Sequence, residues 1–190
     1  MPAVVLDARF KSYKGPDREI AGATFKVPGF VLLVEVTLVQ HGRVNLPQDA
    51  RWVPAIIDTG FSGSFFIATD HLELLGGPRN FRLIPVKGES GKPTATYGSG
   101  ETAPFDQYEG DIWIRNAESD LAPLKLELNG GFAVPVPAAG RPGPRIPLIG
   151  AASLATANLL LTVDYHLLRF TLQTVDPASV LHIHGQSPST

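Results

Sequence analysis

The sequence lacks cysteine altogether, and its 190 residues include one methionine and two tryptophans. Without cysteine, neither disulfide bonds nor thiolate chemistry is available to this chain, which fits a reducing compartment. The apolar run at residues 2–7 is too short for a signal peptide, and no segment approaches the length of a membrane-spanning helix. We therefore expect a cytoplasmic protein with no membrane partner.

Strong charge of either sign is also missing. The formal net charge is -2, and no cluster of lysine or arginine forms a stripe that would neutralise a row of phosphates. The five histidines show no metal-ligand spacing embedded in a helix. We expect no nucleic-acid partner, no metal and no other cofactor.

Glycine and proline are abundant, at 19 and 17 residues, and long helical periodicities are absent. This composition is typical of short strands joined by many turns, so we predict an all-β protein. Strands are expected at residues 30–39, 53–58, 65–68, 81–86, 94–97, 107–114, 124–128, 160–164 and 168–172, with helical turns at 71–75 and 153–159. Residues 130–147 are expected to be irregular. One domain at residues 25–175 should follow an N-terminal strand or arm at 1–24 and precede a polar tail at 176–190.

One acidic residue stands at the end of an apolar run. Val53, Ile56 and Ile57 predict a strand that ends at Asp58, and a glycine-rich turn follows. The flanking residues are apolar enough to bury the base of this turn. A partly buried carboxylate needs hydrogen-bond donors, so we expect donors close to Asp58 in the turn.

The sequence of this turn resembles a known active-site signature. Residues 56–60, Ile-Ile-Asp-Thr-Gly, match the hydrophobic-hydrophobic-Asp-Thr-Gly motif of aspartic proteases. Two further motifs follow in the order that the family has them. Tyr97-Gly98-Ser99-Gly100 is similar to the tip of the flap, and Leu148-Ile149-Gly150 resembles the second signature ahead of a short helix. The chain thus resembles a retropepsin-like aspartic protease over most of its length.

The resemblance implies a closed β-barrel of the acid-protease type, with a flap hairpin and one short helix after Gly150. It makes Asp58 the catalytic residue and gives Thr59 and Gly60 a supporting role in the active site. It also places the substrate-binding flap at its four motif residues, Tyr97, Gly98, Ser99 and Gly100. A flap of this kind would close over an extended polypeptide and exclude water.

Peptide hydrolysis by carboxylates needs one ionised and one protonated group on either side of a water molecule. Aspartic proteases are the established case of two such groups sharing one proton. The sequence contains a single Asp-Thr-Gly and no internal repeat. We therefore expect a homodimer in which Asp58 from each chain forms one site on the two-fold axis. The predicted activity is that of an aspartic endopeptidase, a hydrolase of polypeptide substrates.

An alternative reading is a non-catalytic module of the same fold that binds peptides or dimerises, because a fold does not guarantee its chemistry. The intact Asp-Thr-Gly favours the enzyme. The chain departs from the family pattern at Phe61, where a bulky ring replaces a small residue, and at Ala151-Ala152, where many retropepsins carry arginine. Asp164 also follows an apolar run, but Tyr165 replaces the threonine, so we expect a solvated turn residue there.

Overall fold

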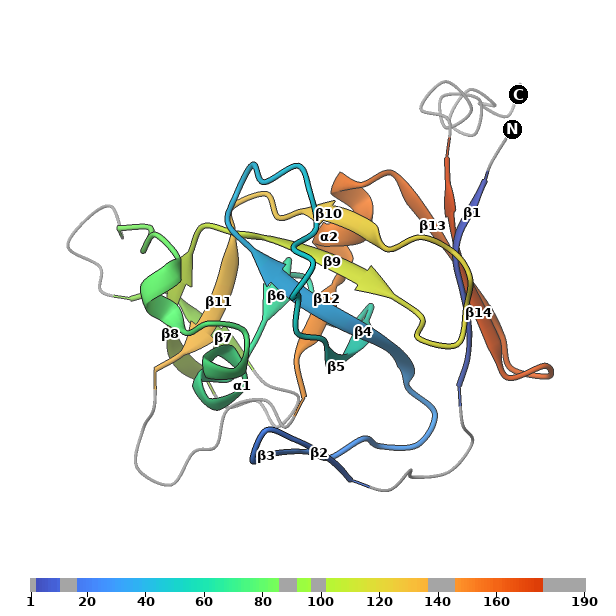
Figure 1. Ribbon diagram of the computed structural model, residues 1–190, viewed down its shortest axis with the longest axis horizontal. Coiled ribbons are helices and arrows are strands. Elements are labelled where there is room, and N and C mark those ends of the chain that lie inside the picture. The colour runs from blue at the N-terminus through green and yellow to red at the C-terminus, as the bar shows by residue number, and fades with distance from the viewer. Residues whose placement is uncertain (1–2, 11–16, 86–91, 97–101, 137–145, 176–190) are drawn as a thin grey trace, which may run out of the picture.

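The computed structural model describes residues 3–10, 17–85, 92–96, 102–136 and 146–175. These residues are mostly β, with two short α-helices and one turn of 3-10 helix (Figure 1). In chain order the elements are β1 (Val4–Arg9), β2 (Arg18–Ile20), β3 (Ala23–Phe25), β4 (Leu32–Val39), β5 (Val53–Asp58), β6 (Phe65–Phe66), α1 (Thr69–Leu74), η1 (Pro78–Asn80), β7 (Thr94–Thr96), β8 (Thr102–Tyr108), β9 (Asp111–Arg115), β10 (Leu124–Glu127), β11 (Phe132–Pro135), β12 (Leu148–Gly150), α2 (Ala151–Thr156), β13 (Leu159–Asp164) and β14 (Arg169–Thr174).

The main sheet has nine strands in the order β10-β9-β4-β5-β12-β6-β11-β8-β7. At the centre of the sheet, β5 and β6 are consecutive in the chain but are separated by a third strand. The chain leaves β5, turns and returns as β6, and β12 lies between the two, parallel to β5 and antiparallel to β6. A strand from late in the sequence therefore lies directly beside the strand that ends at Asp58.

Strand β5 is buried from Val53 to Ile57, so both of its faces are covered. A continuous apolar run of this kind is what a strand inside a protein requires. Strand β4 pairs with it antiparallel, from Leu32 opposite Ile57 to Val36 opposite Val53. The core around these strands includes Phe65, Ile112, Ile114, Leu126, Phe132 and Ile149, each at most 1% exposed.

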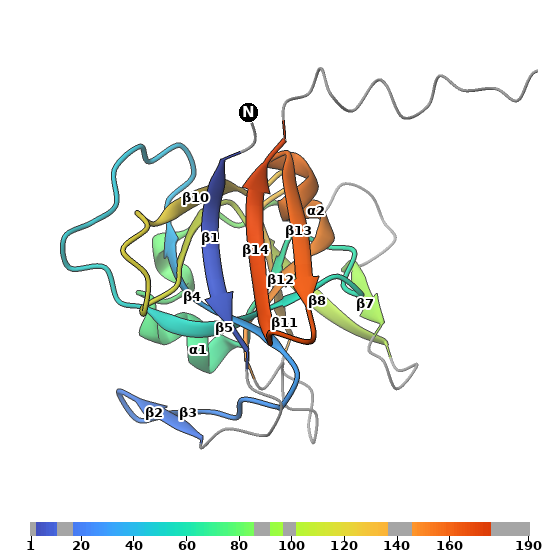
Figure 2. The same ribbon diagram turned by 90° about the vertical axis from the view of Figure 1, so that its right-hand side faces the viewer.

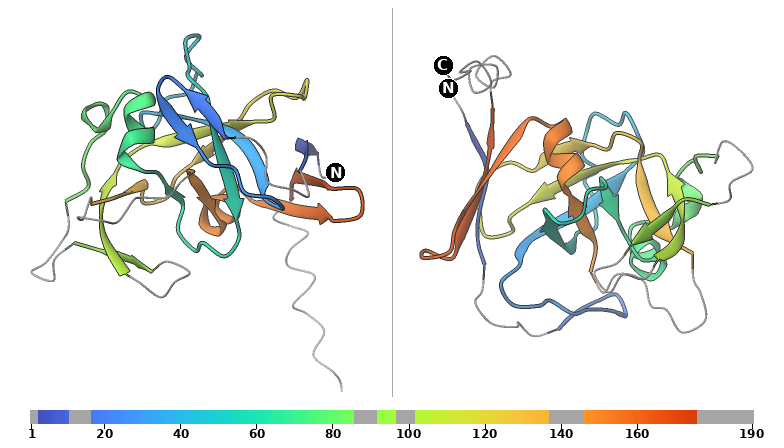
Figure 3. Two further views of the ribbon diagram at one scale, coloured as in Figure 1. Left: turned by 90° about the horizontal axis from the view of Figure 1, so that it is seen from below. Right: turned by 180° about the vertical axis from the view of Figure 1, so that it is seen from behind.

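A second, three-stranded sheet joins the two ends of the described chain. Its order is β1-β14-β13, so the N-terminal strand pairs with the C-terminal hairpin (Figure 2). Leu6 lies opposite Leu172, and both are buried. Helix α2 packs against β13, on the side of this sheet that faces the main sheet (Figure 3).

Several sequence predictions are confirmed. The protein is mostly β, as predicted, and the strand that ends at Asp58, the two C-terminal strands and the short helix after Gly150 all occur. Asp164 is exposed and accepts hydrogen bonds from the amides of His166 and Leu167, as a solvated turn residue does.

Other predictions are wrong. Residues 81–85 form no strand and contribute one bridge, between Leu83 and Tyr108. The strand expected at 107–114 is two strands, because β8 pairs with β7 and β11 whereas β9 pairs with β4 and β10. The strand that returns from the predicted flap is consequently β8, which pairs with β7. Part of the stretch expected to be irregular forms β11, which pairs with β8.

The closed barrel is not confirmed. Within the described residues, the main sheet ends at β10 on one side and at β7 on the other, and these two edges are not paired with each other. A search of the same residues for a helix long and apolar enough to cross a membrane found none.

The β2–β3 hairpin lies beside α1 and is joined to it through a buried histidine. His71 in α1 is 5% exposed, and its ring stacks on Phe25 of β3 at 4.2 Å between centroids. Its Nδ1 atom is buried and has no hydrogen-bond partner among the residues that the structure describes. Desolvation lowers the pKa of His71 below the usual 6.5, against smaller opposite contributions from Asp70 and the backbone of Thr24. The fold therefore favours the neutral imidazole.

We expect this histidine to make the fold sensitive to acid. Because its pKa is lower in the folded state, the unfolded chain binds the proton first, and stability falls as pH drops below about 6.5. The change His71→Phe keeps a stacked ring and should flatten this part of the curve of unfolding free energy against pH, measured by urea denaturation. The exposed His166, changed to Phe, is the control and should leave the curve as it is. Identical curves for wild type and His71→Phe would contradict the assignment.

Candidate active site

Asp58 is the last residue of β5 and is half-buried, as the sequence predicts. The chain turns sharply after it, with the Phe61 amide donating to the Asp58 carbonyl oxygen at 3.1 Å. The Gly60 amide donates to Asp58 Oδ1 at 2.9 Å, which supplies one of the expected donors. Thr59 and Gly60 are exposed at the tip of this turn. The carboxylate is thus held by its own turn through Oδ1, and its second oxygen makes no hydrogen bond or ion pair within the described residues.

The loop at residues 60–64 is attached to Gly150 and α2. The Gly150 amide donates to the Ser64 carbonyl oxygen at 2.8 Å, and the Ala151 amide donates to that of Phe61 at 2.9 Å. The buried Ser153 hydroxyl also donates to the Ser64 carbonyl oxygen, at 2.7 Å. Two amides at the start of α2, which have no partner inside the helix, are satisfied by this loop.

Gly150 has no side chain for a steric reason. A Cβ atom there would lie 2.0 Å from the Gly63 carbonyl oxygen and 2.6 Å from that of Phe61. Gly150 also lies directly opposite Asp58 in the pairing of β12 with β5. Two of the three sequence motifs, far apart in the chain, are therefore in contact.

Asp58 opens onto a cleft of about 800 Å³. One wall is the Asp58 loop, where the Phe61 ring packs at 5.9 Å from the Phe66 ring. The lining also includes Thr94 of β7 and Phe105 of β8. Among the described residues that line this cleft, Asp58 alone is acidic.

The predicted flap tip, Tyr97 to Gly100, lies outside the described residues. Its flanking strands are described, and they form an antiparallel hairpin from Thr94 opposite Pro104 to Thr96 opposite Thr102. The sequence thus locates a hairpin whose limbs line the cleft that holds Asp58. It did not identify Phe105 and Gln107 as lining residues, although their place in the limb that returns from the motif was a usable signal.

No family model, curated protein or solved structure matches the chain.

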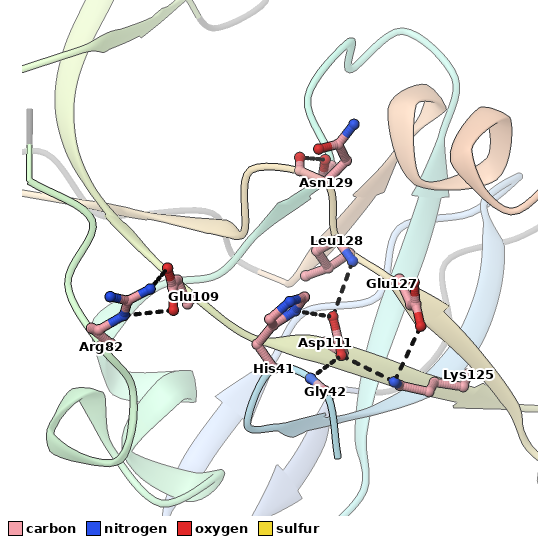
Figure 4. A network of polar contacts seen from close by, with 10 residues as sticks. His41, Gly42, Arg82, Glu109, Asp111, Lys125, Glu127, Leu128 and Asn129 are labelled. Carbon is pink, nitrogen blue, oxygen red and sulfur yellow. Dashed lines mark hydrogen bonds and ion pairs between the residues drawn. The ribbon is translucent and has the colours of Figure 1, made fainter. Parts of the chain in front are cut away.

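A buried carboxylate outside the cleft also escaped the sequence analysis. Asp111, at the start of β9, is fully buried and accepts hydrogen bonds from the amides of Gly42 at 3.0 Å and Leu128 at 3.3 Å (Figure 4). Its oxygens also contact His41 Nδ1 at 3.1 Å and Lys125 Nζ at 3.1 Å. Asp111 thereby ties the loop after β4 and the end of β10 to β9. Its partners are too distant in sequence for a local pattern to reveal the cluster.

The environment of Asp111 favours its ionised form. Burial alone would raise the pKa of this carboxyl, but the four donors from Gly42, His41, Lys125 and Leu128 outweigh burial and lower it. The described residues contain no group of three or more histidine, aspartate or glutamate side chains that would hold a metal ion. We assign Asp111 a structural role.

Replacing Asp111 with asparagine should lower the free energy of unfolding by about 1–3 kcal/mol at pH 7, because Lys125 loses its buried partner and one amide donor faces an NH₂ group. Since the pKa is lowered in the folded state, this contribution is present above the unfolded pKa near 3.8 and disappears as pH falls through the folded value. Urea denaturation of wild type and variant at pH 7 and at pH 3 measures the loss of unfolding free energy and its dependence on pH. Glu127→Gln, at an exposed carboxylate of the same cluster, is the control. A pH-independent difference would contradict the charge-based account.

Proposed function

We propose that this protein is a homodimeric aspartic endopeptidase of the retropepsin type, in which two Asp58 carboxylates activate one water molecule. The observation that carries the proposal is the pairing of β5 with β12. The Asp-Thr-Gly motif and the Leu-Ile-Gly motif were identified separately along the sequence, and Gly150 lies opposite Asp58. A chance match of short motifs gives no reason for this contact.

In the proposed active site, each chain supplies one catalytic carboxylate, and this number determines the mechanism. One Asp58 can take a proton from water or donate one to the substrate carbonyl, but it has one protonation state at a time. Two carboxylates about 3 Å apart disfavour double ionisation and hold a shared proton between them. One then acts as general base while the other polarises the carbonyl. Asp58 is the one acid among the described lining residues, and we propose that the second carboxylate comes from another chain.

The remaining parts of the proposal concern the enclosure of the site. We propose that the β7–β8 hairpin acts as the flap and that Tyr97, Gly98, Ser99 and Gly100 contact an extended substrate. Support comes from the limbs of this hairpin, since Thr94 and Phe105 line the cleft. We also propose that the sheet belongs to the closed-barrel type of this family and that the protein works in a reducing cytosol, which the absence of cysteine fits.

The test is digestion of an unfolded protein between pH 3 and pH 7, with fragments identified by mass spectrometry and the mass of the enzyme followed by light scattering at each pH. We expect cleavage on the acid side, where a shared proton is retained, by a protein with twice the chain mass. A dimer that binds peptides and cuts none at any pH would replace the enzyme with the binding module. A strict monomer that cuts would contradict the two-chain site.

A further inference from the structure

A second cavity, of about 470 Å³, lies between the three-stranded sheet and the main sheet. Its lining comes from the ends of β1 and β9, the turn between β13 and β14, the start of β2, and β4 with the segment before it. Among the described residues it shares no lining residue with the cleft beside Asp58. Small-molecule sites in proteins have volumes of about 300–1,000 Å³. This cavity is therefore of a size to hold a small ligand at a place separate from Asp58.

Most of the residues that line this cavity are apolar, and they include Phe10, Val27, Val31, Leu33, Leu167 and Leu168. Phe10 and Val27 are buried, whereas Leu167 is 60% exposed. The apolar lining therefore runs from the core of the protein to its surface. Leu168 has φ of 49°, at a turn position where a side chain costs roughly 1–2 kcal/mol relative to glycine. An apolar ligand in the cavity would give this side chain a contact.

Three charged side chains form a cluster in the lining, and two of them are arginines. Arg115 donates to Glu35 Oε2 through Nε and Nη2, both at 2.9 Å, and its guanidinium lies 4.2 Å from the centre of the Trp52 ring. These contacts fix the Arg115 side chain. Nη1 of Arg18 lies 3.9 Å from Oε1 of Glu35, which is too far for a hydrogen bond. One carboxylate is thus shared by two guanidinium groups.

The charge of this cluster favours an anionic ligand. Glu35 neutralises one of the two arginines, and the Arg18 side chain makes no hydrogen bond within the described residues. The other charged lining residues, Arg9 and Glu118, are exposed and opposite in sign. A guanidinium group binds a carboxylate through two parallel hydrogen bonds, which are stronger than bonds between neutral groups. A carboxylate beside Arg18 would supply the acceptor that Glu35 does not.

We propose that this cavity binds a small monocarboxylate with an apolar tail. The carboxylate pairs with Arg18, and the tail packs against the apolar side chains around Phe10 and Leu33. An organic cation is disfavoured, because Arg115 already occupies the carboxylate of Glu35. The proposal uses neither Asp58 nor a second chain, so it is independent of the proposed peptidase activity.

Isothermal titration calorimetry with octanoate at low ionic strength and pH 7 tests the ligand class. We expect one site per chain, with a dissociation constant below about 1 mM. Three further probes separate charge from tail. Acetate carries the charge without the tail, 1-octanol carries the tail without the charge, and octylamine reverses the charge. We expect each of them to bind at least about tenfold more weakly than octanoate.

Two variants test the position of the ligand. Arg18→Gln removes the charge from a half-exposed side chain and should raise the dissociation constant of octanoate about tenfold. Its matched control is Arg43→Gln, at an exposed arginine that lines neither cavity. Leu167→Glu places a negative charge in the lining and should abolish binding. Its control is Leu83→Glu, at a leucine that is 51% exposed outside both cavities. Circular dichroism should show the wild-type fold in all four variants.

Two results would overturn the proposal. If wild type binds no octanoate at about 1 mM, or binds 1-octanol and octylamine as tightly, the cavity is not a carboxylate site. If Arg18→Gln and Leu167→Glu bind octanoate as their controls do, the ligand lies elsewhere on the protein. Peptide cleavage tests Asp58 and leaves this cavity untouched, so failure of the protease and failure of the carboxylate site are distinguishable.

Discussion

Cleavage of an unfolded substrate should fall by roughly 10³-fold or more when Asp58 is changed to asparagine, because general acid and general base catalysis are lost together. Asparagine keeps the size of the side chain and its carbonyl oxygen can still accept the Gly60 amide, which is 2.9 Å from Asp58 Oδ1. The turn and the dimer should therefore remain. Initial rates between pH 3 and pH 7, with light scattering in parallel, measure both properties.

Asp164→Asn provides the matched control. Asp164 is also an aspartate at the end of an apolar strand, but its Oδ1 accepts the amides of His166 and Leu167 in an exposed turn. We expect that variant to cut at the wild-type rate, with a small loss of stability at most. Cleavage by Asp58→Asn at the rate of wild type would remove Asp58 from the mechanism.

Changing Gly150 to alanine should destabilise the protein by at least about 3 kcal/mol, since the new Cβ would lie 2.0 Å from one backbone oxygen and 2.6 Å from another. These oxygens belong to Gly63 and Phe61, in the loop that follows Asp58. Relief of the clash displaces this loop, so the fraction that still folds should also lose activity. Urea denaturation and cleavage rates of the folded protein give the two effects.

Gly42→Ala is the control for Gly150→Ala, because it introduces an unfavourable backbone conformation without a steric clash. Gly42 has φ of 77°, but no atom lies within 4 Å of its would-be Cβ. Only the left-handed backbone is disfavoured there, at roughly 1–2 kcal/mol. We expect a smaller loss of stability and normal cleavage from this variant. Equal effects of the two substitutions would mean that the contact between Gly150 and the Asp58 loop is not tight.

The sequence predicted those elements whose apolar pattern is local. The buried run before Asp58, the strand expected at 30–39 and the two C-terminal strands all appear close to where the residues indicated. The apolar stretch at 81–85 misled the prediction, because it lies beside Tyr108 without joining the ladder of β8. Conversely, β11 was not predicted, because it lies in a stretch rich in glycine and proline. Its pairing with β8 outweighs the low strand propensity of that stretch.

The candidate site was only partly accessible from the sequence. Asp58, Thr59 and Gly60 are consecutive, so one turn brings them together. The insertion of β12 between β5 and β6 depends on long-range pairing, and no periodicity in the sequence predicts it. The cluster around Asp111 is similar in this respect, since His41 and Asp111 are separated by 70 positions. Such contacts follow from topology, which local patterns leave open.

The central claim is that one active site takes an Asp58 from each of two chains, and subunit mixing tests it most directly. Wild type is mixed with a ninefold excess of Asp58→Asn, exchange of chains is verified by mass on tagged subunits, and cleavage is measured per wild-type chain. If every site needs two intact carboxylates, random pairing leaves about a tenth of the activity. Activity that stays at the wild-type level after complete exchange would show that a single Asp58 suffices and would contradict the account.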